Sequence, residues 1–342
     1  MLESWIGLNA LITCATLLVE ALVGYPMWLH SRIPHPVVWA GNAINYLERT
    51  WNRTEYSFAK RRLLGVVAVF LLVIAALLLG TGLEFAIIFA DIGKQGANGP
   101  DGFHGAYDPS GGLVTLAVLA LVSSVGLAQK SLFIHVKRVL TALRAGDLAV
   151  ARERVSHIVG RDTRQLDAGG VSAAALESLA ESFNDGVVAP TFWLAVGGLP
   201  GLFVYKVLNT ADSLIGHKEA RWRAFGWAAA RADDVANLVP ARIAGALLTI
   251  AGWGGLLVMF KDAGKHASPN AGWPEAAMAG ALGVRLGGPT TYDGVLHERP
   301  VFGVGPMPGA ADLARGLRVY VIACGLLWLL ALWLFTCMAL SR

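Results

Sequence analysis

The chain has 342 residues, of which 55% are hydrophobic and only 15% are charged, and its mean hydropathy is +0.54. A soluble domain of this length carries more charge, so the composition excludes an ordinary soluble enzyme and indicates a helical integral membrane protein. The net charge of +4 fits basic residues on a cytoplasmic face, and we expect no nucleic-acid partner. Cys14, Cys324 and Cys337 all lie in apolar runs, which suits neither a disulfide framework nor a zinc site.

The predicted fold class is all-α: a polytopic helical integral membrane protein with re-entrant or broken helices and cytoplasmic amphipathic helices. We expect a single integral membrane domain over residues 1–342, because no repeat or long linker divides the chain. Runs of about 18–20 apolar residues are long enough to cross a bilayer as a helix. Such runs predict membrane spans near residues 5–24, 63–84, 113–132, 243–260 and 319–340.

The chain between the first two predicted spans is basic over Trp28–Arg62. Within it, HPVVWAGNAINYLERTWN has the pattern of an amphipathic helix whose start is set by Pro34 and Pro36. The second apolar run contains Glu84 as its only charge, so that helix is either tilted or projects from the membrane. The Gly-rich stretch Asp91–Gly112 follows and predicts a loop.

A second basic region follows the third predicted span. Val136–Val159 alternates apolar and basic side chains at helical spacing, and a break predicts two helices with Asp147 as the N-cap of the second. Because cytoplasmic loops are enriched in Lys and Arg, Trp28–Arg62 and Lys137–Asp185 are expected on the cytoplasmic side. Asp91–Gly112 and the N-terminus are then expected outside.

The topology after residue 186 has two interpretations. Val187–Leu208 is apolar but is interrupted by prolines and by glycine pairs, which predicts a broken or re-entrant pair of short helices that does not cross. If Ile243–Phe260 crosses the membrane, the later motif residues lie outside unless Pro274–Val284 dips back into the protein. If Ile243–Phe260 does not cross, those residues stay inside.

The motif-rich core, residues 160–242, carries the first candidate site. Glu177, Glu181 and Asp185 are spaced i, i+4 and i+8 and therefore share one helix face, with an apolar face opposite. Because like charges repel, such a stripe lies either on a wet surface or against a cation or basic ligand. We expect these three carboxylates to be catalytic.

A second acidic cluster consists of Asp233, Asp234 and Asn237, with Arg231 and Arg242 on either side. Mg²⁺ binds through one or two carboxylates together with phosphate oxygens, so this cluster is the predicted metal site. The alternative is an ion-pair network that holds helices together. The side chains expected to bind substrate or its phosphate are Arg161, Arg164, Lys206, Asn209, Asp212, Lys218, Arg242 and Asn270.

Six stretches carry a resemblance to a known family. In chain order they are HPVVWAGNAINYLE, GRDTRQLD, AESFNDGVVAPTFW, GGLPGLFVYKVLNTADSLIGHK, AARADDVANLVPAR and SPNAGWPEAAMAGALGVRLGGPTTYDG. The set resembles the signature blocks of the CobD/CbiB family, the membrane-bound adenosylcobinamide-phosphate synthases of cobalamin biosynthesis, and covers Tyr25–Gly294. This sequence departs from the family's pattern at Glu20, Ser182 and His217.

The resemblance implies an ATP-dependent amide ligation. Adenosylcobyric acid would be joined to (R)-1-aminopropan-2-ol or its O-phosphate, giving adenosylcobinamide or adenosylcobinamide phosphate. Activation of the carboxylate as an acyl phosphate implies ATP and Mg²⁺ as cofactors, with a carboxylate that takes the proton of the amine. The resemblance also implies a multi-pass protein of the cell inner (cytoplasmic) membrane, in contact with lipid, and soluble enzymes of the cobalamin pathway as candidate partners.

Two alternatives from other classes remain. From the residues alone, the acidic and basic clusters indicate a membrane enzyme that handles a phosphorylated substrate, and a membrane phosphoalcohol transferase would have the same features. Its signature, D-G-x₂-A-R followed by G-x₃-D-x₃-D, is absent. The second alternative is a non-enzymatic AmpE-like membrane sensor of similar helical architecture, against which the full set of family blocks argues.

Overall fold

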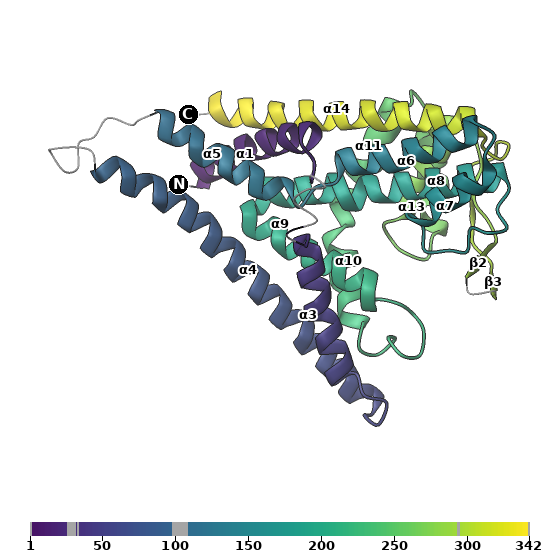
Figure 1. Cartoon of the computed structure of the whole chain (residues 1–342), viewed down its shortest axis with the longest axis horizontal. Coiled ribbons are helices and arrows are strands. Elements are labelled where there is room, and N and C mark those ends of the chain that lie inside the picture. The colour runs from purple at the N-terminus through teal and green to yellow at the C-terminus, as the bar shows by residue number, and fades with distance from the viewer. Residues whose placement is uncertain (1, 26–31, 33, 98–108, 293–294, 341–342) are drawn as a thin grey trace. The chain divides into compact units, whose positions relative to one another are not determined.

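The computed structural model describes residues 2–25, 32, 34–97, 109–292 and 295–340. Helices dominate (Figure 1), and the strands among the described residues form two short antiparallel pairs, so the all-α fold class is confirmed. The chain divides into two compact units. Unit 1 comprises the described residues of Met1–Leu127, Pro190–Val235 and Ala331–Arg342, and unit 2 comprises those of Ala128–Ala189 and Ala236–Leu330.

Unit 1 is built mainly from apolar helices. The helices are α1 (Leu2–Leu22), α3 (Pro36–Trp51), α4 (Phe58–Ala97), α5 (Pro109–Ser124), most of α9 (Ala189–Ile215) and most of α10 (Trp227–Ala236). α1 packs against α5, α5 packs against α4, and α3 lies alongside α4 (Figure 1). At 40 residues, α4 is about 60 Å long, which is about twice the thickness of the hydrocarbon core of a bilayer.

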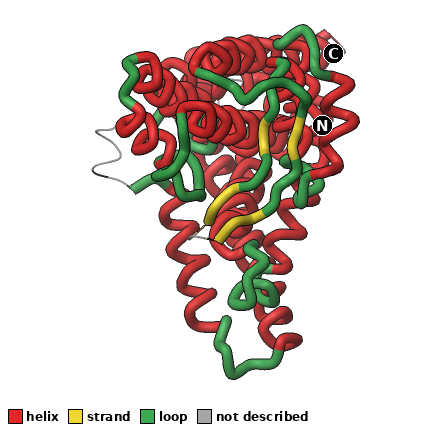
Figure 2. Tube along the Cα trace, turned by 90° about the vertical axis from the view of Figure 1, so that its right-hand side faces the viewer, coloured by secondary structure: helices red, strands yellow, loops and turns green. Residues whose placement is uncertain are grey.

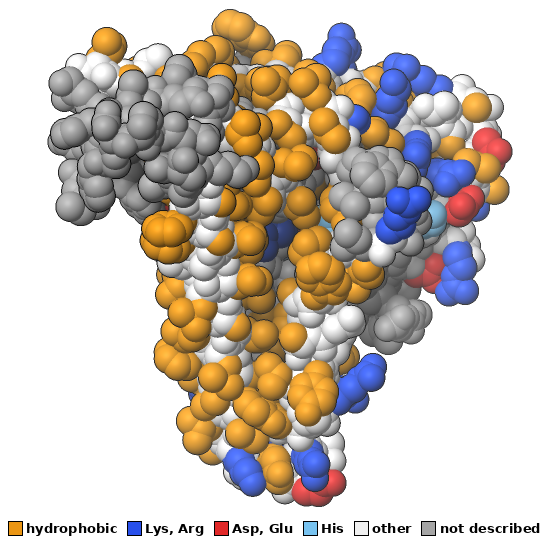
Figure 3. Space-filling view, turned by 60° about the vertical axis from the view of Figure 1, so that its left-hand side comes forward, with side chains coloured by type: hydrophobic (Ala, Val, Ile, Leu, Met, Phe, Trp, Pro, Cys, Tyr) orange, Lys and Arg blue, Asp and Glu red, His pale blue; other side chains and the backbone are white. Residues whose placement is uncertain are grey.

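The surface of α4 is that of a membrane helix. Leu63, Phe70, Leu78 and Phe85 are each more than 60% exposed. Side chains of this kind are stable in contact with lipid but not in contact with water. Hydrophobic side chains also cover much of the face shown in Figure 3. The exposed surface therefore supports the conclusion, drawn from composition, that the protein is a polytopic membrane protein.

Three described helical stretches are long and apolar enough to cross a membrane: Phe58–Ala90, Ala168–Ile215 and Ala310–Leu340. The predicted spans over 63–84 and 319–340 lie inside two of them. Two bent helix pairs bring the number to as many as five by length and composition. One of these pairs replaces the predicted span over 113–132, because α5 ends at Ser124 and the next helix begins at Gln129 with a bend of 41°.

The segment predicted as a membrane span over 243–260 is not one continuous helix. α11 (Leu238–Ala251) ends where Gly252 follows, and α12 (Leu256–Asp262) begins only after Trp253 and Gly255, whose φ angles are 54° and 91°. A left-handed backbone conformation at two nearby positions cannot continue a right-handed helix.

The loop predicted over 91–112 includes residues that are helical, because α4 continues to Ala97 and α5 begins at Pro109.

The predicted helix break near residue 198 is confirmed. Gly198 has φ 61° and ψ −158°, a conformation open to glycine and strained for other residues. Pro200 follows two residues later and has no N–H to donate to the preceding turn. α9 is therefore two helical pieces joined at Gly198.

The amphipathic helix predicted before the second span is confirmed as α3. Pro36 is its first residue, and the His35 side chain accepts a hydrogen bond from Val37 N at 3.3 Å. Ile44 is fully buried, while Tyr46 is exposed. The helix therefore has one face packed in the protein and one face outside it.

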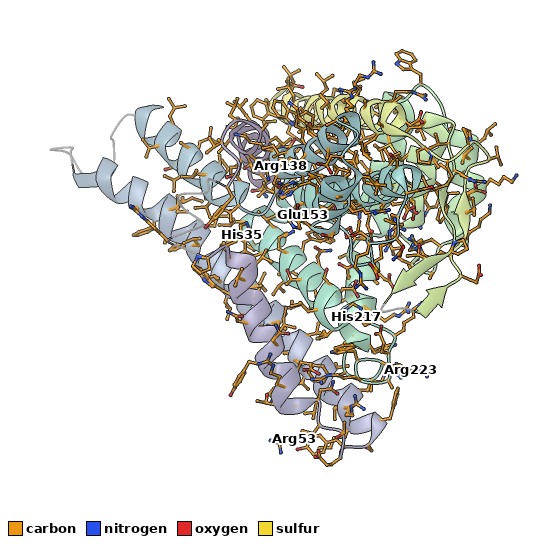
Figure 4. The ribbon with its side chains drawn as sticks, turned by 45° about the vertical axis from the view of Figure 1, so that its right-hand side comes forward. His35, Arg53, Arg138, Glu153, His217 and Arg223 are labelled. Carbon is orange, nitrogen blue, oxygen red and sulfur yellow. The ribbon has the colours of Figure 1, made fainter. Side chains whose placement is uncertain are left out.

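One end of unit 1 is rich in arginine. Arg221 Nε and Nη2 each donate to the Glu48 carboxylate at 2.9 Å. Burial raises the pKa of Glu48, but hydrogen bonds from Arg221 and Asn52 outweigh it and hold that pKa below its ordinary value. Arg53 and Arg223 are exposed side chains of the same unit (Figure 4). A basic end next to apolar helices is typical of the cytoplasmic boundary of a membrane.

Unit 2 contains residues 160–189 and 236–242 of the motif-rich core. Its helices are α6 (Gln129–Arg144), α7 (Leu148–Ser156), α8 (Ala168–Phe183), α11, α12, α13 (Gly272–Leu282) and α14 (Ala310–Leu340) as far as Leu330. Its strands are β1 (Leu286–Gly287), β2 (Thr290–Tyr292), β3 (Val295–His297) and β4 (Val301–Phe302), paired β1 with β4 and β2 with β3 (Figure 2). α13 packs against α8, α11 and α12, so its small residues form the centre of this unit.

The predicted N-cap in unit 2 is confirmed. Asp147 caps α7, because its Oδ1 accepts a hydrogen bond from Val150 N at 3.0 Å. The stretch Pro274–Val284, which had two interpretations, lies for the most part in α13, whose C-cap Gly283 has φ 66°. α13 is buried against other helices of the unit, so it is a helix within the protein core.

Candidate functional site

The predicted acidic stripe begins on α8. Asp167 caps this helix by accepting a hydrogen bond from Gly170 N at 2.7 Å, and Leu179 and Phe183 on the apolar side are fully buried, as expected. Glu177 is buried with them, whereas Glu181 is exposed. The three carboxylates therefore do not share one environment.

The prediction that one α-helix carries all three carboxylates is wrong at its last member. α8 ends at Phe183, and Asp185 lies in a π-helical turn over Asn184–Val188, where Ala189 N donates to Asn184 O. A π-helical turn inserts an extra residue into the helical repeat, so the i, i+4, i+8 spacing no longer defines a straight stripe. Such turns are frequent at functional sites.

Glu177 is the centre of a buried group of charges, which we call the Glu177 cluster: Arg161, Glu177, Glu275 and Arg299. Glu177 Oε2 lies 3.0 Å from Arg161 Nη2 and 3.1 Å from Arg299 Nη1. Its Oε1 accepts a hydrogen bond from the backbone N–H of Gly287 in β1 at 2.9 Å. Two guanidinium groups and a backbone N–H therefore hold this carboxylate in one orientation.

Glu275 is the second carboxylate of the cluster and comes from α13. Its Oε1 lies 3.4 Å from Arg299 Nη2, and its Oε2 lies 3.9 Å from His266 Nε2. Burial, and after it the negative charge of Glu177, raise the pKa of Glu275 to about 8. The cluster thus contains a carboxyl group that exchanges its proton near neutral pH, next to a second carboxylate that is paired with two guanidinium groups.

A second polar group, the Asn184 cluster, consists of Asn184, Asp185 and Asn237, where the π-helical turn packs against the start of α11. Asn184 Nδ2 donates to Asp185 Oδ1 at 2.7 Å and to Asn237 Oδ1 at 2.8 Å. Asn184 Oδ1 is buried and has no hydrogen-bond partner among the described residues. Amide and carboxylate oxygens are the ligands that Mg²⁺ prefers, so this donor set fits that cation.

The other predicted metal ligands lie in unit 1. Asp234 Oδ2 is 3.1 Å from Arg231 Nη1, and Asp233 Oδ1 is 3.5 Å from Asn209 Nδ2. The pairing of Asp234 with Arg231 agrees with the alternative of an ion-pair network. Among the described residues, no three His, Cys, Asp or Glu side chains converge as a metal-binding group. The metal role of Asp233 and Asp234 stays a prediction.

The residues predicted to bind substrate or phosphate have different surroundings. Arg161 is buried in the Glu177 cluster, while Arg164 is exposed and pairs with Asp162 at 2.6 Å, so these two arginines do not form one anion clamp. Arg242 Nη1 donates to Asn270 Oδ1 at 3.1 Å, which joins two predicted residues 28 positions apart in the chain. Three others lie on the second piece of α9 and one follows it: Lys206, Asn209, Asp212 and Lys218.

Sequence reasoning missed Asn184, Glu275 and Arg299. Glu275 stands alone in a run of small residues, and Arg299 lies in an irregular segment, so neither shows a charge pattern. Asn184 is next to the predicted Asp185 and could have been predicted as a site residue. An Asn-Asp pair before an apolar run costs free energy to bury unless both side chains have hydrogen-bond partners.

The fold and this buried charge centre define a polytopic helical membrane protein with a polar site inside a helical unit. The family model described as "CobD/Cbib protein" matches residues 13–320, and the chain belongs to this family. A "Cobalamin biosynthesis protein CobD" of Sinorhizobium sp is 45% identical over 328 residues, covering 92% of this chain and 94% of that protein. Proteins of the same name from Rhodobacter capsulatus and Brucella anthropi are each 44% identical, over 306 and 303 residues. They cover 88% and 86% of this chain, and 90% and 86% of their own lengths. No solved structure matches the chain.

Proposed function

We propose that this protein acts in cobalamin biosynthesis as an ATP-dependent amide ligase. It would join adenosylcobyric acid to (R)-1-aminopropan-2-ol or its O-phosphate. Family membership and the names of its relatives support the pathway. The Glu177 cluster supports the chemistry, because amide formation from an amine needs a group that takes up a proton near neutral pH.

The reaction has two steps. A carboxylate oxygen of the corrinoid attacks the γ-phosphorus of ATP, and ADP leaves, so that an acyl phosphate forms. The amine then attacks the acyl carbon, phosphate leaves, and the nitrogen loses a proton. The protein must therefore bind two anionic partners, screen phosphate charge and accept that proton.

The observation that carries the proposal is the pairing of Glu177 with Glu275. Glu177 is paired with Arg161, Arg299 and a backbone N–H, and its negative charge is, after burial, a cause of the raised pKa of Glu275. A carboxyl group whose pKa is about 8 is ionised in part near neutral pH, and its ionised form is a stronger base than an ordinary carboxylate. In this account Glu275 accepts the proton of the amine, and Glu177 positions Arg299 and maintains the electrostatic environment.

Mg²⁺ would be held by the oxygens of the Asn184 cluster, with Asp233 and Asp234 as the alternative ligands predicted from the sequence. When bound, Mg²⁺ neutralises phosphate charge on ATP and so favours attack at the γ-phosphorus. Arg242, which is hydrogen-bonded to Asn270, is placed to bind an anionic group at the start of α11.

The test is incubation of the purified full-length protein with adenosylcobyric acid, aminopropanol phosphate and Mg-ATP. We expect adenosylcobinamide phosphate and ADP in equal amounts, and a parallel reaction with free aminopropanol identifies the preferred amine. Glu153→Gln, a change at an exposed position on α7, serves as the matched control and should retain full turnover. Absence of amide with both amines, in a protein that is folded, would contradict the proposal.

A further inference from the structure

α1 of unit 1 has its polar side chains inside the protein. Asn9, Thr13, Thr16 and Glu20 are spaced i, i+4, i+7 and i+11 and therefore form one stripe about 16 Å long. All four are at most 2% exposed, whereas Leu22, away from the stripe, is 67% exposed. In a membrane helix, an inward polar face marks a functional interior, because lipid contacts only the apolar face.

Several polar atoms on and beside this stripe are buried without a hydrogen bond. Thr13 Oγ1 donates to Asn9 O at 2.7 Å, but Asn9 Oδ1, Asn9 Nδ2 and Thr16 Oγ1 have no partner among the described residues. The same is true of Ser123 Oγ on α5, the helix that packs against α1 (Figure 1). An orphaned buried polar group costs about 1–3 kcal/mol, so several of them together indicate an occupant other than protein.

The broken helix α9 places a further polar group beside Asn9. Glu84 is the only charged residue of α4 between Leu63 and Ala90, and its Oε2 accepts a hydrogen bond from Leu199 N at 3.1 Å. Leu199 is the residue that follows the break at Gly198, where the second piece of α9 begins with an N-terminal, electropositive end. Neither Glu84 nor Asn9 has an ion pair or hydrogen bond with a Lys, Arg or His side chain among the described residues.

Three side-chain oxygens from α4 and α1 lie close to Gly198. A Cβ atom built on Gly198 would lie 2.9 Å from Glu84 Oε2, 3.3 Å from Glu84 Oε1 and 3.3 Å from Asn9 Oδ1. The α4 backbone is close as well, because a Cβ on Gly80 would lie 2.6 Å from Pro200 Cα. The Glu84 carboxylate and the Asn9 carboxamide oxygen therefore converge on the break, where only a glycine leaves them room.

We propose that Glu84, Asn9 and the break at Gly198 form a site for a monovalent inorganic cation, Na⁺ or K⁺, within the membrane-spanning helices of unit 1. A carboxylate in an apolar span needs a compensating charge, and an unpaired Asn carboxamide supplies a further oxygen ligand. A single carboxylate balances the charge of a monovalent cation. It would leave one positive charge of Mg²⁺ unbalanced, and Mg²⁺ also releases its bound water reluctantly. Broken membrane helices bind cations through backbone carbonyls that no longer accept a helical hydrogen bond. The carbonyl of Val196 is one of these, because Pro200, four residues later, has no N–H to donate to it.

The test uses the full-length protein in detergent, in choline chloride at constant ionic strength. Choline is replaced by Na⁺ or by K⁺, and Tm is followed by the fluorescence of the 11 tryptophans. We expect a saturable rise in Tm of about 5 °C with one of the two cations. No saturable response to either cation would overturn the proposal, because Glu84 would then be compensated by a proton.

Two variants assign the response to this site. Glu84→Gln should abolish the rise in Tm, while the control Glu153→Gln should keep it. Asn9→Leu removes two orphaned polar groups, so in choline it should be at least as stable as the wild type and yet lose the cation response. A purely structural Asn9 would give lower stability with the response intact, which would also overturn the proposal. If a variant does not fold, equilibrium binding of radioactive Na⁺ and K⁺ to the wild type decides: about one ion per chain supports the site, and none excludes it.

Discussion

Glu177 and Glu275 come from different helices, α8 and α13, and share the guanidinium group of Arg299. Its Nη1 lies 3.1 Å from Glu177 Oε2, and its Nη2 lies 3.4 Å from Glu275 Oε1. Two buried carboxylates that share one cation cannot both be ionised without a cost, and Glu177 also has Arg161 as a partner. The proton therefore resides on Glu275.

The first prediction concerns pH. The pKa of Glu275 is raised in the folded protein from its ordinary value to about 8, so the native state binds a proton that the unfolded state releases. The free energy of unfolding should therefore fall as pH rises from about 4.5 to about 8, by at most about 1.4 kcal/mol per pH unit. Above pH 8 Glu275 is ionised in both states, so it should cause no further fall. Glu275→Gln should flatten this dependence, as measured by Tm from pH 5 to pH 8.5.

The same variant tests the role of Glu275 in turnover. If Glu275 accepts the proton of the amine, kcat should rise as pH passes through about 8 and then level off. Glu275→Gln should lose this rise and about 10²-fold or more of the rate. A variant that keeps the wild-type pH–rate profile would exclude Glu275 as the base.

The second prediction separates the two glutamates of α8. Glu177→Gln takes the carboxylate partner in this cluster away from the buried Arg161 and leaves Arg299 with Glu275, so it should cost about 3 kcal/mol of stability and lower Tm. Glu181→Gln is on an exposed position and should change stability by no more than about 0.5 kcal/mol. Thermal unfolding of both variants gives the comparison, and equal losses would contradict the buried cluster.

Glu181 also carries the catalytic prediction made from the sequence. We expect Glu181→Gln to keep its Tm and to lose about 10²-fold or more in amide formation. Turnover close to the wild type would remove Glu181 from the site and leave Glu275 as the acidic group that acts in the reaction.

The third prediction distinguishes the two candidate metal groups. If the Asn184 cluster holds Mg²⁺, Asn184→Leu should raise the Mg²⁺ concentration for half-maximal activity by about 10-fold or more. If the sequence-based prediction holds, Asp234→Asn should have this effect instead. Mg²⁺ titrations of both variants decide the matter, and a shift in neither would leave both groups structural.

The fourth prediction concerns topology. A cysteine at Gly99, which lies outside the described residues, should react with an impermeant reagent added from outside the cell. A cysteine at Ala145, between α6 and α7, should be protected until the membrane is permeabilised. Ala145 is preferable to the adjacent Gly146, whose φ of 75° disfavours any side chain. The reverse labelling pattern would invert the orientation.

Features that depend on neighbouring residues were predictable from the sequence. The Asp147 cap, the start of α3 at Pro36 and the break at Gly198 follow from local backbone and hydrogen-bonding rules, and the structure has all three. The helix end at Gly252 was missed because the apolar run continues through it, and hydropathy does not register a left-handed backbone.

The centre of the site was only partly predictable. Glu177 stood out by its spacing from Glu181, but its partner Arg299 is 122 residues away in the chain. No periodicity connects positions so far apart, since their contact arises from the packing of α8 against α13 and β1. The π-helical turn at Asn184 was also missed, because Pro190, two residues after its end, indicates a helix break but not an extra residue in the helical repeat.

The most direct test of the central claim follows the oxygen atoms of the acid. Adenosylcobyric acid labelled with ¹⁸O in the reacting carboxylate is incubated with the protein, aminopropanol phosphate and Mg-ATP, and the released phosphate is analysed by mass spectrometry. Ligation through an acyl phosphate predicts ADP, the amide and phosphate that carries ¹⁸O. Amide formed together with unlabelled phosphate, or no amide at all, would contradict the account.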